Sequence, residues 1–207
     1  MKMRRLLIIG AGGHGRVCAD IASRMGEWDS IAFLDDNTNV ESVLGFPVLG
    51  AAVEAEKYFH DSDIFVGIGN NEVRASFLSD LEEEGIRCPI LVHPSAVVSD
   101  SVNIEHGTVI MAGVIINPRT SIGKGCILNT GCTVDHDCTV KDYVHISPGS
   151  HIGGTVTIED YCWLGIGSVV INDLHIGPHC IIGAGAVVIE DLTGYGQYVG
   201  VPARKLK

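Results

Sequence analysis

A six-residue period runs through "LNTGCTVDHDCTV", residues 128–140, and continues along the chain on both sides of it. Counting in sixes meets an aliphatic residue at sixteen consecutive steps: Val98, Ile104, Ile110, Ile116, Ile122, Leu128, Val134, Val140, Ile146, Ile152, Ile158, Leu164, Val170, Ile176, Ile182 and Val188. The faces of an α-helix repeat near 3.6 residues, so a strict hexad excludes a helix. Hexapeptide periods are instead typical of a parallel β-helix, in which each hexad supplies one short strand and one turn.

Three hexads then close one triangular coil of 18 residues, and the coils stack at the strand spacing of about 4.8 Å. We expect the aliphatic residues to fill the interior, beside the smaller residue that comes four positions later. Five cysteines fall on that smaller position and are interpreted as packed core thiols: Cys126, Cys132, Cys138, Cys162 and Cys180. Cys162 and Cys180 should lie one above the other, although a disulfide between them is not expected in a cytoplasm.

The composition limits the partners of the chain. It has 207 residues, 46% of them apolar, and a formal net charge of −11. This balance allows a sizeable core and argues against a general nucleic-acid surface, which needs a basic face. No stretch of about 20 apolar residues occurs, so no membrane span is expected. Seven cysteines without a CxxC pair, and an apolar start too short for a signal peptide, predict a cytoplasmic protein with free thiols.

The first part of the chain carries the pattern of a nucleotide-binding α/β domain. "RRLLIIGAGGHGRVCADIASRMG" reads as a strand, a Gly-rich turn and a helix, with Gly10, Gly12 and Gly15 in the arrangement G-x-G-x-x-G. Asp35 ends the next strand, twenty residues after Gly15. Dinucleotide-binding folds place an acidic residue near a ribose hydroxyl at this spacing.

The size of this domain limits the kind of nucleotide that it can bind. We expect a Rossmann-like domain over residues 1–92 and the parallel β-helix over residues 93–207. "DIFVGIGNNEVR" adds a third strand and then a helix at about residues 72–84, which leaves room for one mononucleotide-binding half rather than two. A mononucleotide, such as the UDP of a sugar nucleotide, is therefore favoured over NAD.

His136 is the candidate catalytic residue of the second domain. It lies in a turn, with Pro118 eighteen residues before it and Gly154 eighteen residues after it. The three should share one edge of the prism, where Gly154 leaves open space beside the ring and a backbone N–H that a ligand can approach. A base next to a bare N–H donor is what acyl transfer requires. Turn positions in this repeat are commonly polar, so a solvated turn residue is the alternative interpretation.

The hexad array resembles the left-handed β-helix of the hexapeptide-repeat acyltransferases. "LNTGCTVDHDCTVKDYVHISPGSHIGG" and the tail "YVGVPARKLK" are similar to the sialic-acid O-acetyltransferase-like sugar acyltransferases, and in particular to the bacterial UDP-4-amino-sugar N-acetyltransferases of bacillosamine biosynthesis. "GAGGHGRVCADIA", "FLDD" and "GIGNNEVR" extend the resemblance to the N-terminus. It implies an acetyl-CoA-dependent N-acetyltransferase that acts on the C4 amino group of a UDP-linked 4-amino-4,6-dideoxy sugar.

The resemblance also implies roles for single residues. His136 matches the catalytic base of the family, and Asp137 matches the acidic residue that orients it, although aspartate is one methylene shorter than the family's glutamate. Asn129 is implied to contact the amino sugar, and His145 to lie near the sugar or the acetyl group. Gly154 matches the glycine whose N–H faces the thioester carbonyl.

Family members bind UDP through the N-terminal domain and form homotrimers with active sites between subunits. The matching nucleotide-binding positions are Gly12, Gly13, His14, Asp35, Asp36, Gly69, Asn70 and Asn71. Acetyl-CoA would lie along the groove between subunits, near His145 and Gly154, with Arg204 and Lys205 facing its phosphates. No metal is implied.

Three rival functions remain open from the sequence. The nearest is O-acetylation of sialic acid or a related sugar, which leaves a nucleotide-sized first domain without a purpose. A zinc enzyme on the same prism is the second, although His136, His145 and His151 show no obvious convergence in the sequence. The third is a non-enzymatic sugar-nucleotide sensor or scaffold, against which the intact His136 and Asn129 argue.

Overall fold

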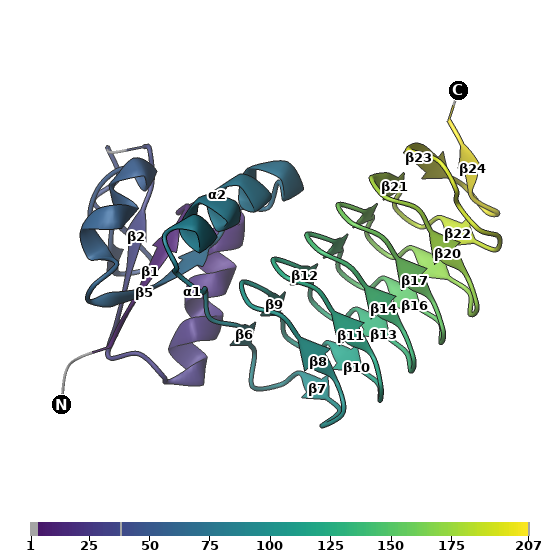
Figure 1. The fold of residues 1–207 in the computed structure, drawn as a ribbon, viewed down its shortest axis with the longest axis horizontal. Coiled ribbons are helices and arrows are strands. Elements are labelled where there is room, and N and C mark those ends of the chain that lie inside the picture. The colour runs from purple at the N-terminus through teal and green to yellow at the C-terminus, as the bar shows by residue number, and fades with distance from the viewer. Residues whose placement is uncertain (1–3, 38, 207) are drawn as a thin grey trace. The chain divides into compact units, whose positions relative to one another are not determined.

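The computed structural model describes residues 4–37 and 39–206. The chain divides between Pro94 and Ser95 into two compact units (Figure 1). Within the described residues, no helix combines the length and the apolar character that a membrane crossing demands.

The first unit is built on a three-stranded parallel sheet with the order β2-β1-β5. Its strands are β1 (Arg5–Ile9), β2 (Ser30–Leu34) and β5 (Ser62–Val66). The continuous apolar run of β1 is buried from Leu6 to Ile9, as expected of a strand in a parallel sheet covered on both faces. A sheet of this size corresponds to a single mononucleotide-binding half.

Two helices follow the strands of this sheet. Helix α1 (Gly13–Met25) comes directly after β1, and helix α2 (Asn71–Glu83) comes after β5. Gly15 is required where α1 passes β1, because a Cβ on it would lie 1.9 Å from the carbonyl oxygen of Gly10. The remaining elements are the hairpin of β3 (Ser42–Val43) and β4 (Phe46–Pro47), the 3-10 helix η1 (Ala52–Tyr58) and β6 (Leu91–Val92).

The second unit is a parallel β-helix with three faces. The β7 face contains β7 (Val97–Val98), β10 (Ile115–Ile116), β13 (Thr133–Val134), β16 (His151–Ile152), β19 (Val169–Val170) and β22 (Val187–Val188). The β8 face contains β8 (Asn103–Ile104), β11 (Ser121–Ile122), β14 (Thr139–Val140), β17 (Thr157–Ile158) and β20 (His175–Ile176). The β9 face contains β9 (Val109–Ile110), β12 (Ile127–Leu128), β15 (His145–Ile146), β18 (Trp163–Leu164), β21 (Cys180–Ile182), β23 (Gly196–Val199) and the antiparallel β24 (Arg204–Lys205).

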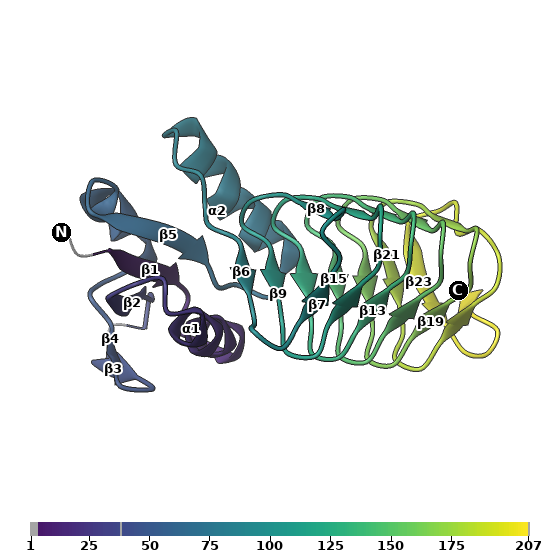
Figure 2. The same cartoon turned by 90° about the horizontal axis from the view of Figure 1, so that it is seen from below.

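Apart from β24, each strand pairs in parallel with the strand one coil away, as in the register of Ile115 with Thr133. Figure 2 shows the coils stacked along one axis. From Ile110 to Val188, every aliphatic residue of the hexad series is at most 2% exposed. The two earlier members, Val98 and Ile104, are half-buried in the first coil. The predicted α/β domain followed by a hexapeptide β-helix is confirmed.

Where the smaller inward position holds a threonine, serine or cysteine, its side chain can hydrogen-bond to the next coil. Thr120 Oγ1 donates to the carbonyl of Asp135 at 2.7 Å, and Ser150 Oγ donates to the carbonyl of Gly165 at 2.8 Å. The thiols of Cys126, Cys138 and Cys162 make the same contact with the carbonyl fifteen residues ahead. All five hexad cysteines are buried and free, which confirms their interpretation as packed thiols.

Candidate active site

His136 lies in the turn between β13 and β14, with its side chain 55% exposed. Its Nδ1 is 2.7 Å from Oδ2 of Asp137, the next residue. Asp137 reaches back to the ring because its backbone is left-handed, with φ of 58°. A hydrogen on Nδ1 donates to the carboxylate, which leaves the lone pair on Nε2 for a proton from a substrate. Although aspartate is one methylene shorter than glutamate, its carboxylate therefore reaches the ring.

Arg119, one coil earlier, holds the other side of Asp137. Its Nη2 lies 2.8 Å from Oδ2 and 2.7 Å from Oδ1 of that carboxylate. Hydrogen bonds from Arg119 and then from His136 lower the pKa of Asp137. Arg119 belongs to no motif of the sequence, although it lies eighteen residues before Asp137, which is one coil of the repeat.

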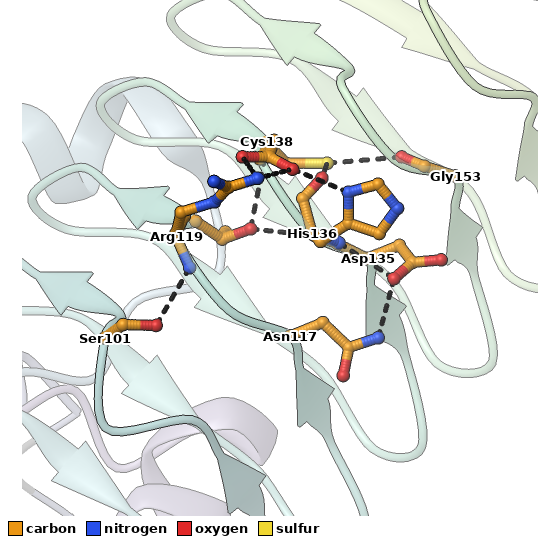
Figure 3. A network of polar contacts seen from close by, with 9 residues as sticks. Ser101, Asn117, Arg119, Asp135, His136, Cys138 and Gly153 are labelled. Atoms are coloured by element: carbon orange, nitrogen blue, oxygen red, sulfur yellow. Dashed lines mark hydrogen bonds and ion pairs between the residues drawn. The ribbon is translucent and has the colours of Figure 1, made fainter.

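Asp135 fixes the turn from the other flank of His136. Its Oδ1 accepts from the backbone N–H of His136 at 2.8 Å and from Nδ2 of Asn117 at 2.7 Å. The hydrogen bond from Asn117, followed by that from the His136 backbone, lowers the pKa of Asp135. Figure 3 shows these side chains on successive coils of one edge.

Gly154 lies under the imidazole ring. A Cβ on Gly154 would be 2.8 Å from Cε1 and 2.9 Å from Nε2 of His136. The space that the missing side chain leaves is therefore filled by the His136 ring, which corrects the expectation of an open space beside it. Among the described residues, no backbone carbonyl accepts a hydrogen bond from the N–H of Gly154.

Asn129 and His145 form a second group at a different edge. Asn129 follows β12 and lies where the β9 face meets the β7 face, with Nδ2 3.3 Å from Nε2 of His145. The His145 ring stacks on Trp163, with a centroid distance of 5.7 Å and an interplanar angle of 4°. Within one copy of the chain, the β7 face separates this group from His136.

Arg204 and Lys205, which are expected to face the phosphates of acetyl-CoA, each contact another residue of this chain. Arg204 Nη1 lies 2.9 Å from Oε1 of Glu190. The aliphatic part of Lys205 packs over Gly196, where a Cβ would be 2.6 Å from Cε of the lysine.

The histidines of the β-helix do not gather around one point. His151 Nδ1 is 3.0 Å from Oγ1 of Thr133. Residues 4–37 and 39–206 contain no group of three or more histidine, cysteine or acidic residues that could hold a metal.

The first unit has a pocket at the carboxyl ends of its parallel strands, with a volume of about 380 Å³. Of the predicted nucleotide-binding residues it is lined by Gly12, Gly13, His14, Asp35, Asp36 and Gly69. Sequence reasoning missed the apolar lining, which includes Ile68, Val73 and Phe77. The pocket lies beside the first turn of α1, whose backbone N–H groups favour an anionic ligand.

The two aspartates brace this pocket as well as lining it. Asp35 accepts from the backbone N–H of Ala11 at 2.7 Å and of Asn37 at 2.9 Å. Asp36 Oδ1 accepts from the N–H of Ala52 at 3.1 Å. Both carboxylates keep further lone pairs for ligand hydroxyl groups.

Asn70 and Asn71 do not belong to the pocket lining. Asn70 is the N-cap of α2, because its Oδ1 accepts from the N–H of Val73 at 3.0 Å. Asn71 Oδ1 accepts from Nη2 of the buried Arg74 at 2.8 Å. The structure thus gives both asparagines a part in building the strand-to-helix turn, and their expected contact with the nucleotide stays a prediction.

A nucleotide-sized α/β unit joined to a hexapeptide β-helix with a histidine at its edge defines the class of hexapeptide-repeat transferases. Comparison with known families agrees: residues 5–81 match the PglD N-terminal domain, and residues 155–190 match the bacterial transferase hexapeptide. A curated relative, UDP-N-acetylbacillosamine N-acetyltransferase from Bacillus subtilis (strain 168), is 36% identical over 115 residues. That match covers 53% of this chain and 52% of the relative, so the alignment spans about half of the curated protein.

Solved structures match over the whole chain. The acetyltransferase domain of PglB from Neisseria gonorrhoeae FA1090, determined with acetyl coenzyme A, is 38% identical, has a TM-score of 0.95 and covers 99% of this chain and 100% of its own. PerB from Caulobacter crescentus, determined with CoA and GDP-perosamine, is 36% identical, has a TM-score of 0.91 and covers 98% and 97%. The chain belongs to the hexapeptide-repeat sugar acetyltransferases that carry a PglD-type N-terminal domain.

Proposed function

We propose that this protein is an acetyl-CoA-dependent N-acetyltransferase that acetylates the C4 amino group of a UDP-linked 4-amino-4,6-dideoxy sugar. The observation that carries the proposal is the dyad of His136 and Asp137, with its 2.7 Å contact, above the bare Gly154. A ring that donates from Nδ1 presents Nε2 as a base, which is the group an attacking amine needs.

In the proposed reaction the C4 amine attacks the thioester carbonyl of acetyl-CoA. His136 Nε2 takes the proton that the nitrogen loses as the C–N bond forms. The N–H of Gly154 donates to the oxyanion of the tetrahedral intermediate. The C–S bond then breaks, and CoA leaves as the thiol after it receives the proton.

The relatives support nitrogen rather than oxygen as the acceptor. The Bacillus subtilis protein is named UDP-N-acetylbacillosamine N-acetyltransferase. A relative from Caulobacter crescentus is named GDP-perosamine N-acetyltransferase, and a histidine-to-alanine variant of it was solved with CoA and GDP-perosamine. O-acetylation of sialic acid is the alternative, but it gives the pocket of the first unit no nucleotide to bind. UDP is favoured over GDP by the motif resemblance of the first unit to the UDP-sugar enzymes.

The distribution of apolar side chains supports a homotrimer with shared sites. Most of the exposed large apolar side chains of the β-helix lie on the β7 and β9 faces or in the turns next to them: Val97, Ile115, Trp163, Ile166, Ile171, Ile181, Ile189, Val199 and Val201. Tyr195 and Leu206, near the end of the chain, are exposed as well. The outward positions of the β8 face are Asn103, Ser121, Thr139, Thr157 and His175. A second copy seated against the apolar faces would bury this surface and bring Asn129 and His145 of one copy toward His136 of the other.

The decisive experiment measures thiol release from acetyl-CoA with a panel of acceptors: UDP-4-amino sugars, their GDP and dTDP counterparts, and free sialic acid. Release with one UDP-4-amino sugar, and a product heavier by one acetyl group, is the expected result. Release with sialic acid alone would move the reaction to oxygen. No release with any acceptor, together with nucleotide binding to the first unit, would favour a sugar-nucleotide sensor.

A further inference from the structure

The three edges of the β-helix differ at one turn position, which has a left-handed backbone in coil after coil. Between the β9 and β7 faces this position is always glycine, at Gly113, Gly131, Gly149, Gly167 and Gly185. Between the β7 and β8 faces, where His136 lies, it is never glycine in the left-handed coils: Arg119, Asp137, Thr155 and Asp173 have φ of 62°, 58°, 62° and 63°.

Left-handed backbone is strained for any residue with a Cβ, and glycine removes that strain. Along the edge between the β9 and β7 faces, glycine occupies the equivalent position in the same β-helix. The backbone therefore gives no reason for a large cationic residue at position 119, and the reason must lie in its side chain.

Among residues 4–37 and 39–206, the side chain of Arg119 has one defined partner, the carboxylate of Asp137, at 2.7 and 2.8 Å. Its own backbone is fixed from the preceding coil, since its N–H donates to Oγ of Ser101 at 3.0 Å. Ser101, Arg119 and Asp137 thus form a chain of contacts that runs up the edge, one coil at a time, and ends at Nδ1 of His136. Figure 3 labels Ser101, Arg119 and His136 of this chain.

We propose that Arg119 is a positioning residue for His136: it clamps Asp137 against Nδ1 and offsets the negative charge of that carboxylate, so that Nε2 faces the substrate with its lone pair. This inference rests on the proposed function, because it assigns Arg119 to the same site. Arg119 itself touches neither Nε2 nor Gly154 and acts through Asp137 alone.

The charges around the ring determine how the loss of Arg119 should change the proton affinity of His136. On its own turn His136 is flanked by Asp135 and Asp137, and the coil above carries Asp173 beyond Gly154. Arg119 is the cation paired with this acidic group in the described structure. Without it the uncompensated carboxylates favour the protonated ring, which cannot accept a proton from the amine.

The test compares the pH dependence of kcat/KM in the wild type, Arg119→Gln and Arg119→Lys. Loss of the charge in Arg119→Gln should move the acidic limb of the profile to higher pH by about half a unit, the size expected for one charge near the protein surface. Arg119→Lys keeps the charge and should restore the limb. Arg119→Gly, which also relieves the left-handed strain, should fold as well as the wild type and still show the displaced limb.

A matched control is Arg24→Gln, which breaks an exposed arginine–aspartate pair on α1 with a separation of 2.8 Å; its profile should be that of the wild type. An unmoved acidic limb in Arg119→Gln would overturn the proposal. So would a raised KM for acetyl-CoA or the sugar nucleotide without a change in the limb, because Arg119 would then be a ligand contact.

The pH titration of the His136 ring signal by NMR, assigned through its loss in His136→Ala, separates this inference from the proposed function. A higher midpoint in Arg119→Gln supports the clamp even if the acceptor panel fails. An unchanged midpoint overturns the clamp even if the enzyme acetylates its sugar.

Discussion

The imidazole of His136 packs against the α-carbon of Gly154, one coil further along. A methyl group would not fit between them, because a Cβ on residue 154 would lie 2.8 Å from Cε1 of the ring. Gly154 lies outside the left-handed region, so its backbone would accept alanine. The glycine is therefore required by the ring and not by the turn.

Gly154→Ala is expected to fold normally and to lose activity. The new methyl group pushes the ring off its position, and misplacement of a catalytic group by about 1 Å costs on the order of 100-fold in rate. Steady-state kinetics give the loss, and circular dichroism confirms the fold. Added to His136→Ala, the change should cause little further loss if it acts through the ring; a large additional loss would assign the effect to the N–H of Gly154.

His136→Ala should lower turnover by roughly two to four orders of magnitude, the usual contribution of a general base. The ring lies at the surface of a turn, 55% exposed at its side chain, so the fold does not depend on it. Turnover is measured with the acceptor identified from the panel, at saturating acetyl-CoA. Turnover close to that of the wild type would remove His136 from the mechanism.

Asp137 should make the stability of the protein depend on pH. Its pKa is lowered in the folded state by Arg119 and His136, so its contribution is complete above its unfolded pKa of about 3.9 and is lost as the pH falls through the folded value. Thermal unfolding of the wild type and Asp137→Asn should therefore differ near neutral pH and converge below about pH 4. A difference that stays constant across this range would contradict the ion pair.

Mixing two inactive variants tests whether the site is shared between copies. His136→Ala retains the Asn129 group, and Asn129→Ala, which loses its 3.3 Å contact with His145, retains His136. If one copy supplies each group, one of the three sites in every mixed trimer is restored, which is about a third of the sites. The two variants carry different affinity tags, and only doubly purified mixed oligomers are assayed. Mixed oligomers that stay inactive would place both groups in the site of one copy.

Much of this molecule is readable from local sequence. The hexads from Val98 to Val188 predicted the coils, the buried aliphatic column and the packed thiols, because each inward position repeats the same steric demand. The same eighteen-residue count places Gly154 beside His136, where the structure has it. The glycines of the first unit likewise predicted a pocket at the start of α1.

Other parts followed from contacts that no motif encodes. The motif predicts a nucleotide contact for Asn70 and Asn71, and only the structure shows that backbone and side-chain donors of α2 also hydrogen-bond to their amide oxygens. Arg119 looked like one more polar turn residue, and only the stacking of its coil against Asp137 gave it a partner.

The sequence by itself determined the period, the inward and outward positions, and the edge on which His136 lies, since a repeat of eighteen residues fixes which residues stack. Only the tertiary structure decided where the side chains point: that the ring covers Gly154, that Asp137 turns toward both Nδ1 and Arg119, and that Asn129 and His145 meet at another edge. The physical reason is that periodicity constrains the backbone, whereas side-chain direction depends on φ at each turn and on the charges that the neighbouring coil presents.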